Sequence, residues 1–193
     1  ASRFENPDTG ITSREPGDRP VRFEVEVGAG VRAVYPRGSR PALVSPNWRF
    51  GFNLWVHLFG LSLEGEAMTD SLFLAERRTY SRLFHTLSFK LALPIEARLA
   101  IPARAWFVLG AGGGLGGIKL EPEPWALLYG AKEMVQFVLS TPQERGPRQW
   151  GGFRIEQQQV WWTGGEGPEH STQIMLLFGF TTGGWGPSWR KYG

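Results

Sequence analysis

The sequence predicts an all-β protein, an eight-stranded antiparallel up-and-down transmembrane β-barrel. Three observations lead to this fold class. Long segments alternate between apolar and polar residues, which places the two kinds of side chain on opposite faces of a strand. The composition, with 26 Gly, 9 Trp and 13 Phe among 193 residues, favours strands over helices. Eight alternating segments can be counted, and an even number of antiparallel strands can close without exposed edges.

We expect the chain to divide into three parts. Residues 1–20 combine three prolines with seven charged residues and no periodicity, which is typical of a flexible tail. The barrel is expected over residues 21–182, followed by a C-terminal extension over residues 183–193. Because the first residues lack the basic start and apolar segment of a signal peptide, we expect a mature sequence that begins at Ala1.

The first strand, residues 21–35, alternates without error over a length well beyond the five or so residues usual in soluble proteins. The fifth is glycine-rich, where a barrel strand needs to curve, and the last two form the clearest hairpin around the turn TGGEGPEH. The sixth also shows a helical spacing of apolar residues, but we interpret it as a strand. The predicted strands are 21–35, 47–58, 60–68, 80–93, 103–118, 131–140, 149–162 and 171–182.

Alternation alone fits two barrels that are inside out relative to each other. A soluble lipocalin-like barrel would hold an apolar ligand inside, against Phe23, Val25 and Phe52, whereas an outer-membrane barrel turns its apolar face to lipid. The length of the strands, the glycines on the charged face and the aromatic residues near strand ends favour the membrane barrel. The expected aromatic girdles consist of Tyr35, Trp48, Tyr80, Trp106, Trp150, Trp161, Trp162, Phe180 and Trp185.

The polar face would then fill the lumen of the barrel. Charges of both signs occur there in comparable number, and eight strands make a barrel narrow enough for side chains to meet across it. Glu64 and Glu66 add to the same face. We expect a charge network that leaves little room for conduction, formed by Arg22, Glu24, Glu26, Arg32, Arg49, Lys90, Glu96, Arg98, Arg154 and Glu156.

The closing hairpin, GFRIEQQQVWWTGGEGPEHSTQIMLLFGF, resembles that of the outer-membrane lipid A 3-O-deacylase family and its acyloxyacyl-hydrolase-like relatives. The segment ARAWFVLGAGGGLGG is similar to the glycine-rich middle strand of these barrels. In the hairpin, the family's arginine strand carries a His-x-Ser-Asn motif. Phe153 and Arg154 match its start, while its histidine and serine positions fall on Gln157 and Gln159. Because glutamine can neither take a proton from a nucleophile nor attack an ester, the resemblance implies a barrel without catalytic residues.

These observations predict a non-catalytic barrel in the outer membrane of a Gram-negative bacterium, with a structural or protein-interaction role in a cell-envelope assembly. Gln157 and Gln159 share the lipid face with Trp161, so we expect them to contact a partner protein or lipid headgroups. The expected partners are lipopolysaccharide, phospholipid and other envelope proteins. The alternative is a lipid A-modifying hydrolase. The absence of cysteine, three histidines without metal-like spacing, and scattered basic residues with a net charge of +3 argue against a cofactor, a metal site and nucleic-acid binding.

Overall fold

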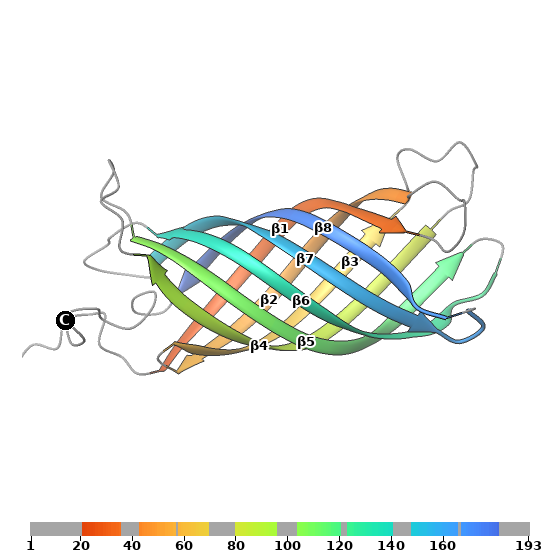
Figure 1. The fold of residues 1–193 in the computed structure, drawn as a ribbon, viewed down its shortest axis with the longest axis horizontal. Helices are drawn as coiled ribbons and strands as arrows, with labels where there is room; N and C mark the ends of the chain where they lie inside the picture. Colours follow the sequence, from red (N-terminus) through yellow and green to blue (C-terminus); the bar gives the residue numbers. More distant parts are fainter. Residues whose placement is uncertain are drawn as a thin grey trace, which may run out of the picture.

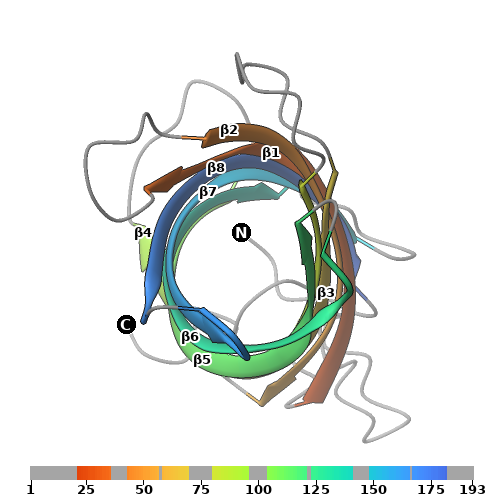
Figure 2. The ribbon, with the colours of Figure 1, turned by 90° about the vertical axis from the view of Figure 1, so that its right-hand side faces the viewer.

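The computed structural model describes residues 21–35, 43–56, 58–69, 80–95, 104–120, 123–140, 148–165 and 167–181. They form β1 (Val21–Tyr35), β2 (Leu43–Val56), β3 (Phe59–Thr69), β4 (Tyr80–Ile95), β5 (Arg104–Leu120), β6 (Ala126–Ser140), β7 (Arg148–Trp162) and β8 (Glu169–Thr181). Each strand pairs antiparallel with its neighbours in sequence, and β1 pairs with β8, which closes the barrel (Figures 1 and 2). The predicted fold class is therefore confirmed.

Two segments differ by four or more residues at one end from the strand limits expected from the sequence. β2 begins at Leu43, earlier than the expected residue 47, and ends at Val56, while β3 begins at Phe59. The sixth segment is a strand over Ala126–Ser140 and pairs on both sides, with β5 and with β7. Its helical spacing has no structural counterpart, because pairing with two neighbours satisfies its backbone as a strand.

The register of the barrel can be followed from strand to strand. The pairs that start at Val21 run through Val56, Phe59, Leu91, Leu109, Val135, Ile155 and Ile174 and return to β1 at Val31. One circuit therefore shifts the register by ten residues, from position 21 to position 31. A shift of this size requires strongly tilted strands, as Figure 1 shows.

The faces of the strands meet different surroundings. Phe23 and Phe52 are 62% and 53% exposed on the outside, whereas Glu26 and Arg154 are fully buried inside. A ligand held in the lumen against Phe23, Val25 and Phe52 does not fit this arrangement, because the alternation points these side chains outward. The soluble lipocalin-like alternative is therefore wrong.

Some predictions concern residues outside the described ranges. These are the N-terminal tail (residues 1–20), the C-terminal extension (residues 183–193), and Glu96 and Arg98 of the expected charge network. Among the residues that the structure does describe, there is no helix with the length and apolarity needed to cross a membrane.

Candidate functional site

The middle of the lumen holds a network of buried ionic side chains. The participants come from six strands, and each has 5% or less of its surface exposed. Four glutamates, Glu26, Glu64, Glu66 and Glu156, meet the cations Arg32, Arg49, Lys90, Lys132 and Arg154. Buried charges are expensive unless paired, so the near balance of sign is what makes this interior possible.

Glu64 on β3 is the central carboxylate. Arg49, Lys90 and Arg154 place their nitrogens 3.1, 2.9 and 3.1 Å from its oxygens, and Lys132 also forms an ion pair with it. These four cations lie on β2, β4, β7 and β6. One side chain therefore ties together strands from around the barrel.

A second set of contacts lies toward the end where odd-numbered strands finish, called here the second end of the barrel. Arg32 Nη2 lies 2.8 Å from Glu66 Oε2 and 3.1 Å from Glu156 Oε1. Arg49 Nη2 lies 2.9 Å from Glu66 Oε2. Gln158 donates to Glu66 Oε2 at 3.1 Å and to Glu156 Oε1 at 2.7 Å, so a neutral amide shares these two carboxylate oxygens with the arginines.

The structure places eight of the ten residues expected in the network inside the barrel. These are Arg22, Glu24, Glu26, Arg32, Arg49, Lys90, Arg154 and Glu156. Glu24 accepts a hydrogen bond from Asn53 at 2.6 Å, away from the centre of the network. Lys132, Arg82 and Glu169 are also buried inside but were missed. Lys132 was missed because it lies in the segment whose strand character was ambiguous, and its inward face follows only from the alternation of Leu128, Met134 and Val138.

Apolar side chains fill the lumen on either side of the network. At the first end of the barrel, where the odd-numbered strands begin, Trp55, Trp106 and Trp150 are buried within one cluster. At the second end, a cluster contains Val34, Met68, Phe84, Ile118, Leu128 and Val160. The lumen therefore has a charged layer between two mainly apolar layers, with Arg22 beside Trp55 in the first and Arg82 beside Met68 and Ile118 in the second.

This layering corrects part of the expected aromatic girdles. Trp106 and Trp150 have 0% and 3% exposed surface inside the barrel, and Trp162 packs against the second-end cluster. The prediction was wrong for these three because an apolar side chain near a strand end was assumed to face lipid. Trp48, Tyr35 and Phe180 do lie on the outer wall, with exposed fractions of 59%, 50% and 50%. The side chain of Tyr80, and Trp185 altogether, lie outside the described part of the structure.

The outer wall carries polar side chains on β6 and β7. Gln157 is exposed, Gln159 and Trp161 are half-buried, and Gln158 between them points into the lumen. Glu133 on β6 is directly paired with Gln157, and its side chain is exposed as well. The rings of Tyr129 and Trp161 stack nearby, with centroids 5.8 Å apart. The sequence reasoning missed Glu133 for the same reason that it missed Lys132.

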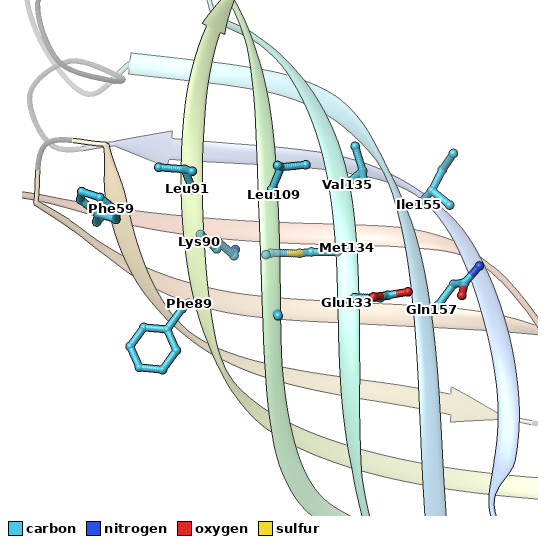
Figure 3. A pocket seen from close by; sticks show the side chains of 12 residues that line it. Phe59, Phe89, Lys90, Leu91, Leu109, Glu133, Met134, Val135, Ile155 and Gln157 are labelled. Atoms are coloured by element: carbon cyan, nitrogen blue, oxygen red, sulfur yellow. The ribbon is translucent and has the colours of Figure 1, made fainter.

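A groove of about 770 Å³ lies on the outer wall across β4 to β7, with Phe59 of β3 also lining it (Figure 3). Its sides are apolar and include Phe89, Leu109, Val135 and Ile155, while Ala111 contributes little side chain to its floor. Glu133 and Gln157 line the same groove, and Figure 3 shows their side chains close together. The groove is therefore apolar over most of its lining, with a polar edge.

Among the described residues, two histidines lie close in sequence to a serine, His85 to Ser88 and His170 to Ser171, but neither pair forms a hydrolytic dyad. His85 and His170 are exposed on the outer wall, whereas Ser88 and Ser171 are buried inside. Each histidine is thus separated from its neighbouring serine by the wall of the barrel. The described part of the chain also contains no group of three or more His, Cys, Asp or Glu side chains that could hold a metal ion.

Comparison with known proteins gives a likeness of fold. No family model and no curated protein matches the chain. The crystal structure of Neisserial surface protein A (NspA) matches with a TM-score of 0.58 and 9% identity, covering 82% of this chain and 96% of that one. The chain has the fold of an outer-membrane β-barrel. Ail, the attachment invasion locus protein of Yersinia pestis, matches with a TM-score of 0.47 and 8% identity, over 84% of this chain and 99% of that one. None of these matches shows a relationship to lipid A deacylases.

Proposed function

We propose that the protein is a non-catalytic barrel of a Gram-negative outer membrane, with a structural or protein-interaction role in the cell envelope. The observation that carries this proposal is the combination of an apolar outer wall with a filled, ionic interior. An eight-stranded barrel in water would bury its apolar side chains, whereas this one buries its charges. The fold shared with NspA supports the same environment.

The filled lumen argues against transport through the barrel. Its charged layer is closed by ion pairs such as Arg154 Nη2 to Glu26 Oε1 at 2.7 Å, and apolar clusters lie on both sides of it. A solute would have to break several buried pairs at once, each costly to break. Function is therefore expected on the outer wall and at the connections between strands.

On the outer wall, Gln157, Gln159 and Trp161 are the proposed contact surface for lipid or for another envelope protein. Amide groups on a lipid-facing wall are costly unless they find hydrogen-bond partners. In the resemblance to the deacylase family, two of them occupy the positions of the catalytic histidine and serine. The same residues therefore support an interaction role in place of a hydrolytic one.

Two measurements test this function. Cell fractionation should recover the protein in outer membranes, resistant to carbonate and with heat-modifiable mobility on a gel, as expected for a folded barrel. Photo-reactive residues at Gln159 and Trp161 should cross-link to other envelope proteins, while a control at Leu176 should not. Recovery in the soluble fraction would overturn the membrane location. Membrane recovery without any protein cross-link would leave a structural barrel and overturn the interaction role.

A further inference from the structure

We infer that the groove across β4 to β7 binds a zwitterionic phospholipid with a primary ammonium headgroup, held at Glu133 and Gln157. This inference rests on the proposed membrane location. It adds a specific ligand and a residue, Glu133, that the sequence did not single out.

The depth of Glu133 in the barrel follows from the strand register. Eight steps from strand to strand move the pairing ten residues along β1, from Val21 to Val31. Each step therefore accounts for one eighth of that advance along the barrel axis. For a rise of about 3.3 Å per residue and a tilt of roughly 40°, one residue advances about 2.5 Å and one step about 3 Å. On this scale, Glu133 lies about 21 Å and Gln157 about 24 Å from the level of Val21 at the first end.

The outer wall carries different side chains on either side of that depth. Between the first end and Glu133, β5, β6 and β8 turn apolar side chains outward, namely Phe107, Leu109, Val135, Phe137, Leu139, Leu176, Phe178 and Phe180. Beyond it, the outer wall carries polar Gln159, Thr172 and His170 together with apolar Leu115 and Leu127. The apolar band of such barrels is about 25 Å tall. Glu133 is the first polar side chain on the outward face of β6 counted from the first end, so with Gln157 it lies near the level where hydrocarbon gives way to headgroups.

Glu133 and Gln157 lie at the edge of the apolar groove in the outer wall. The groove runs along the apolar band beside Ala111, whose methyl group leaves the floor low between Phe89 and Ile155. An acyl chain that lies in this groove would pack its methylene groups against Phe89, Leu109 and Ile155. Its headgroup would then reach Glu133 and Gln157, which line the same groove.

The polar edge of the groove offers a carboxylate and an amide. Glu133 is exposed, and it forms no hydrogen bond or ion pair with any described residue. Its carboxylate can accept from an ammonium group, and the amides of Gln157 and Gln159 can donate to a phosphodiester. Among the strand residues whose side chains the structure describes, the one lysine or arginine on the outer wall is Lys119, near the far end of β5. The site therefore matches a zwitterionic headgroup better than an anionic one.

Native mass spectrometry of the full chain provides the test. The folded protein in detergent would receive equal amounts of phosphatidylethanolamine, phosphatidylcholine, phosphatidylglycerol and lipid A. We expect phosphatidylethanolamine to be retained at least threefold more than phosphatidylcholine, whose methylated ammonium cannot donate. E133Q keeps the shape but removes the charge, and it should bring the two to equal retention. Q157A should lower the retention of both, because the Gln157 amide would donate to the phosphodiester that they share. The matched control T172V, at a comparable depth on β8 outside the groove, should retain the wild-type preference.

Retention of all four lipids in equal amounts, or an unchanged preference in E133Q, would overturn the inference. Stronger retention of lipid A or phosphatidylglycerol would overturn it as well, because the site would then recognise an anion. Heat-modifiable mobility of the same samples reports separately whether a membrane-type barrel is present. A folded barrel without lipid preference refutes the lipid site alone, whereas loss of the folded barrel would refute the proposed function.

Discussion

Arg49 on β2 and Glu156 on β7 meet inside the lumen, with Nη2 and Oε2 2.7 Å apart, although their strands are not neighbours in the barrel. Backbone hydrogen bonds connect each strand with its two neighbours. The ion pair adds a connection across the interior. Because both side chains are buried, neither charge can be solvated if its partner is lost.

We predict that Arg49 and Glu156 are energetically coupled. R49M and E156M should each lower the free energy of unfolding by about 3 to 5 kcal/mol, because each leaves buried charges unbalanced. The double variant R49M/E156M should cost less than the sum of the two, which a double-mutant cycle by urea titration in lipid vesicles would measure. E123Q, which alters an exposed glutamate, is the control and should match the wild type. Strict additivity would contradict the coupling.

The inward glycines of β5 should be intolerant of any side chain. A Cβ built on Gly114 would overlap the backbone carbonyl of His85, so G114A must displace β4 from β5. We expect a loss of stability of at least about 3 kcal/mol, at the upper end of the range for overpacking. G65A is the control, because its Cβ would meet His85 Nδ1 at an ordinary 3.5 Å. Equal unfolding midpoints for the two variants would show that β4 and β5 are packed less tightly than described.

The cost of a charge on the outer wall should depend on depth. Leu176 is 63% exposed on the outer wall and lies about 17 Å from the first end, whereas Thr172 on the same strand lies about 27 Å from it. L176R should lower the free energy of unfolding in lipid vesicles by about 2 to 4 kcal/mol, and T172R by at most about 1 kcal/mol. Equal costs would place the hydrocarbon boundary elsewhere and would remove the depth argument for Glu133.

The barrel should not conduct ions. In planar bilayers, the wild type should show no steady channel, because two apolar clusters and the charged layer fill the lumen. W55A/W106A/W150A removes the large side chains at the first end but leaves the charged layer and the second cluster. It should therefore remain as silent as the wild type. A steady open channel in the wild type would refute the filled lumen.

The sequence predicted much of the fold because strand faces depend on local alternation. The fifteen residues of β1 show this, with Arg22, Glu24 and Glu26 all buried and Phe23 exposed, as period-two geometry requires. Prediction was weakest where the inward face becomes apolar. Trp106 and Trp150 share the inward face with Val108 and Arg154, and an apolar residue on that face cannot be told from a lipid-facing one by hydropathy.

Alternation along the chain is enough to predict that strands form, that their two faces differ, and that one face carries charges of both signs. Which charges meet depends on the folded barrel. Glu26 and Arg154 form a pair 128 positions apart in the chain, and Glu64 receives cations from four other strands. Alternation is set by the geometry of one strand, whereas these partners depend on the register of every pairing and on the ten-residue shift at closure. The depth of Glu133 on the outer wall follows from that same closure.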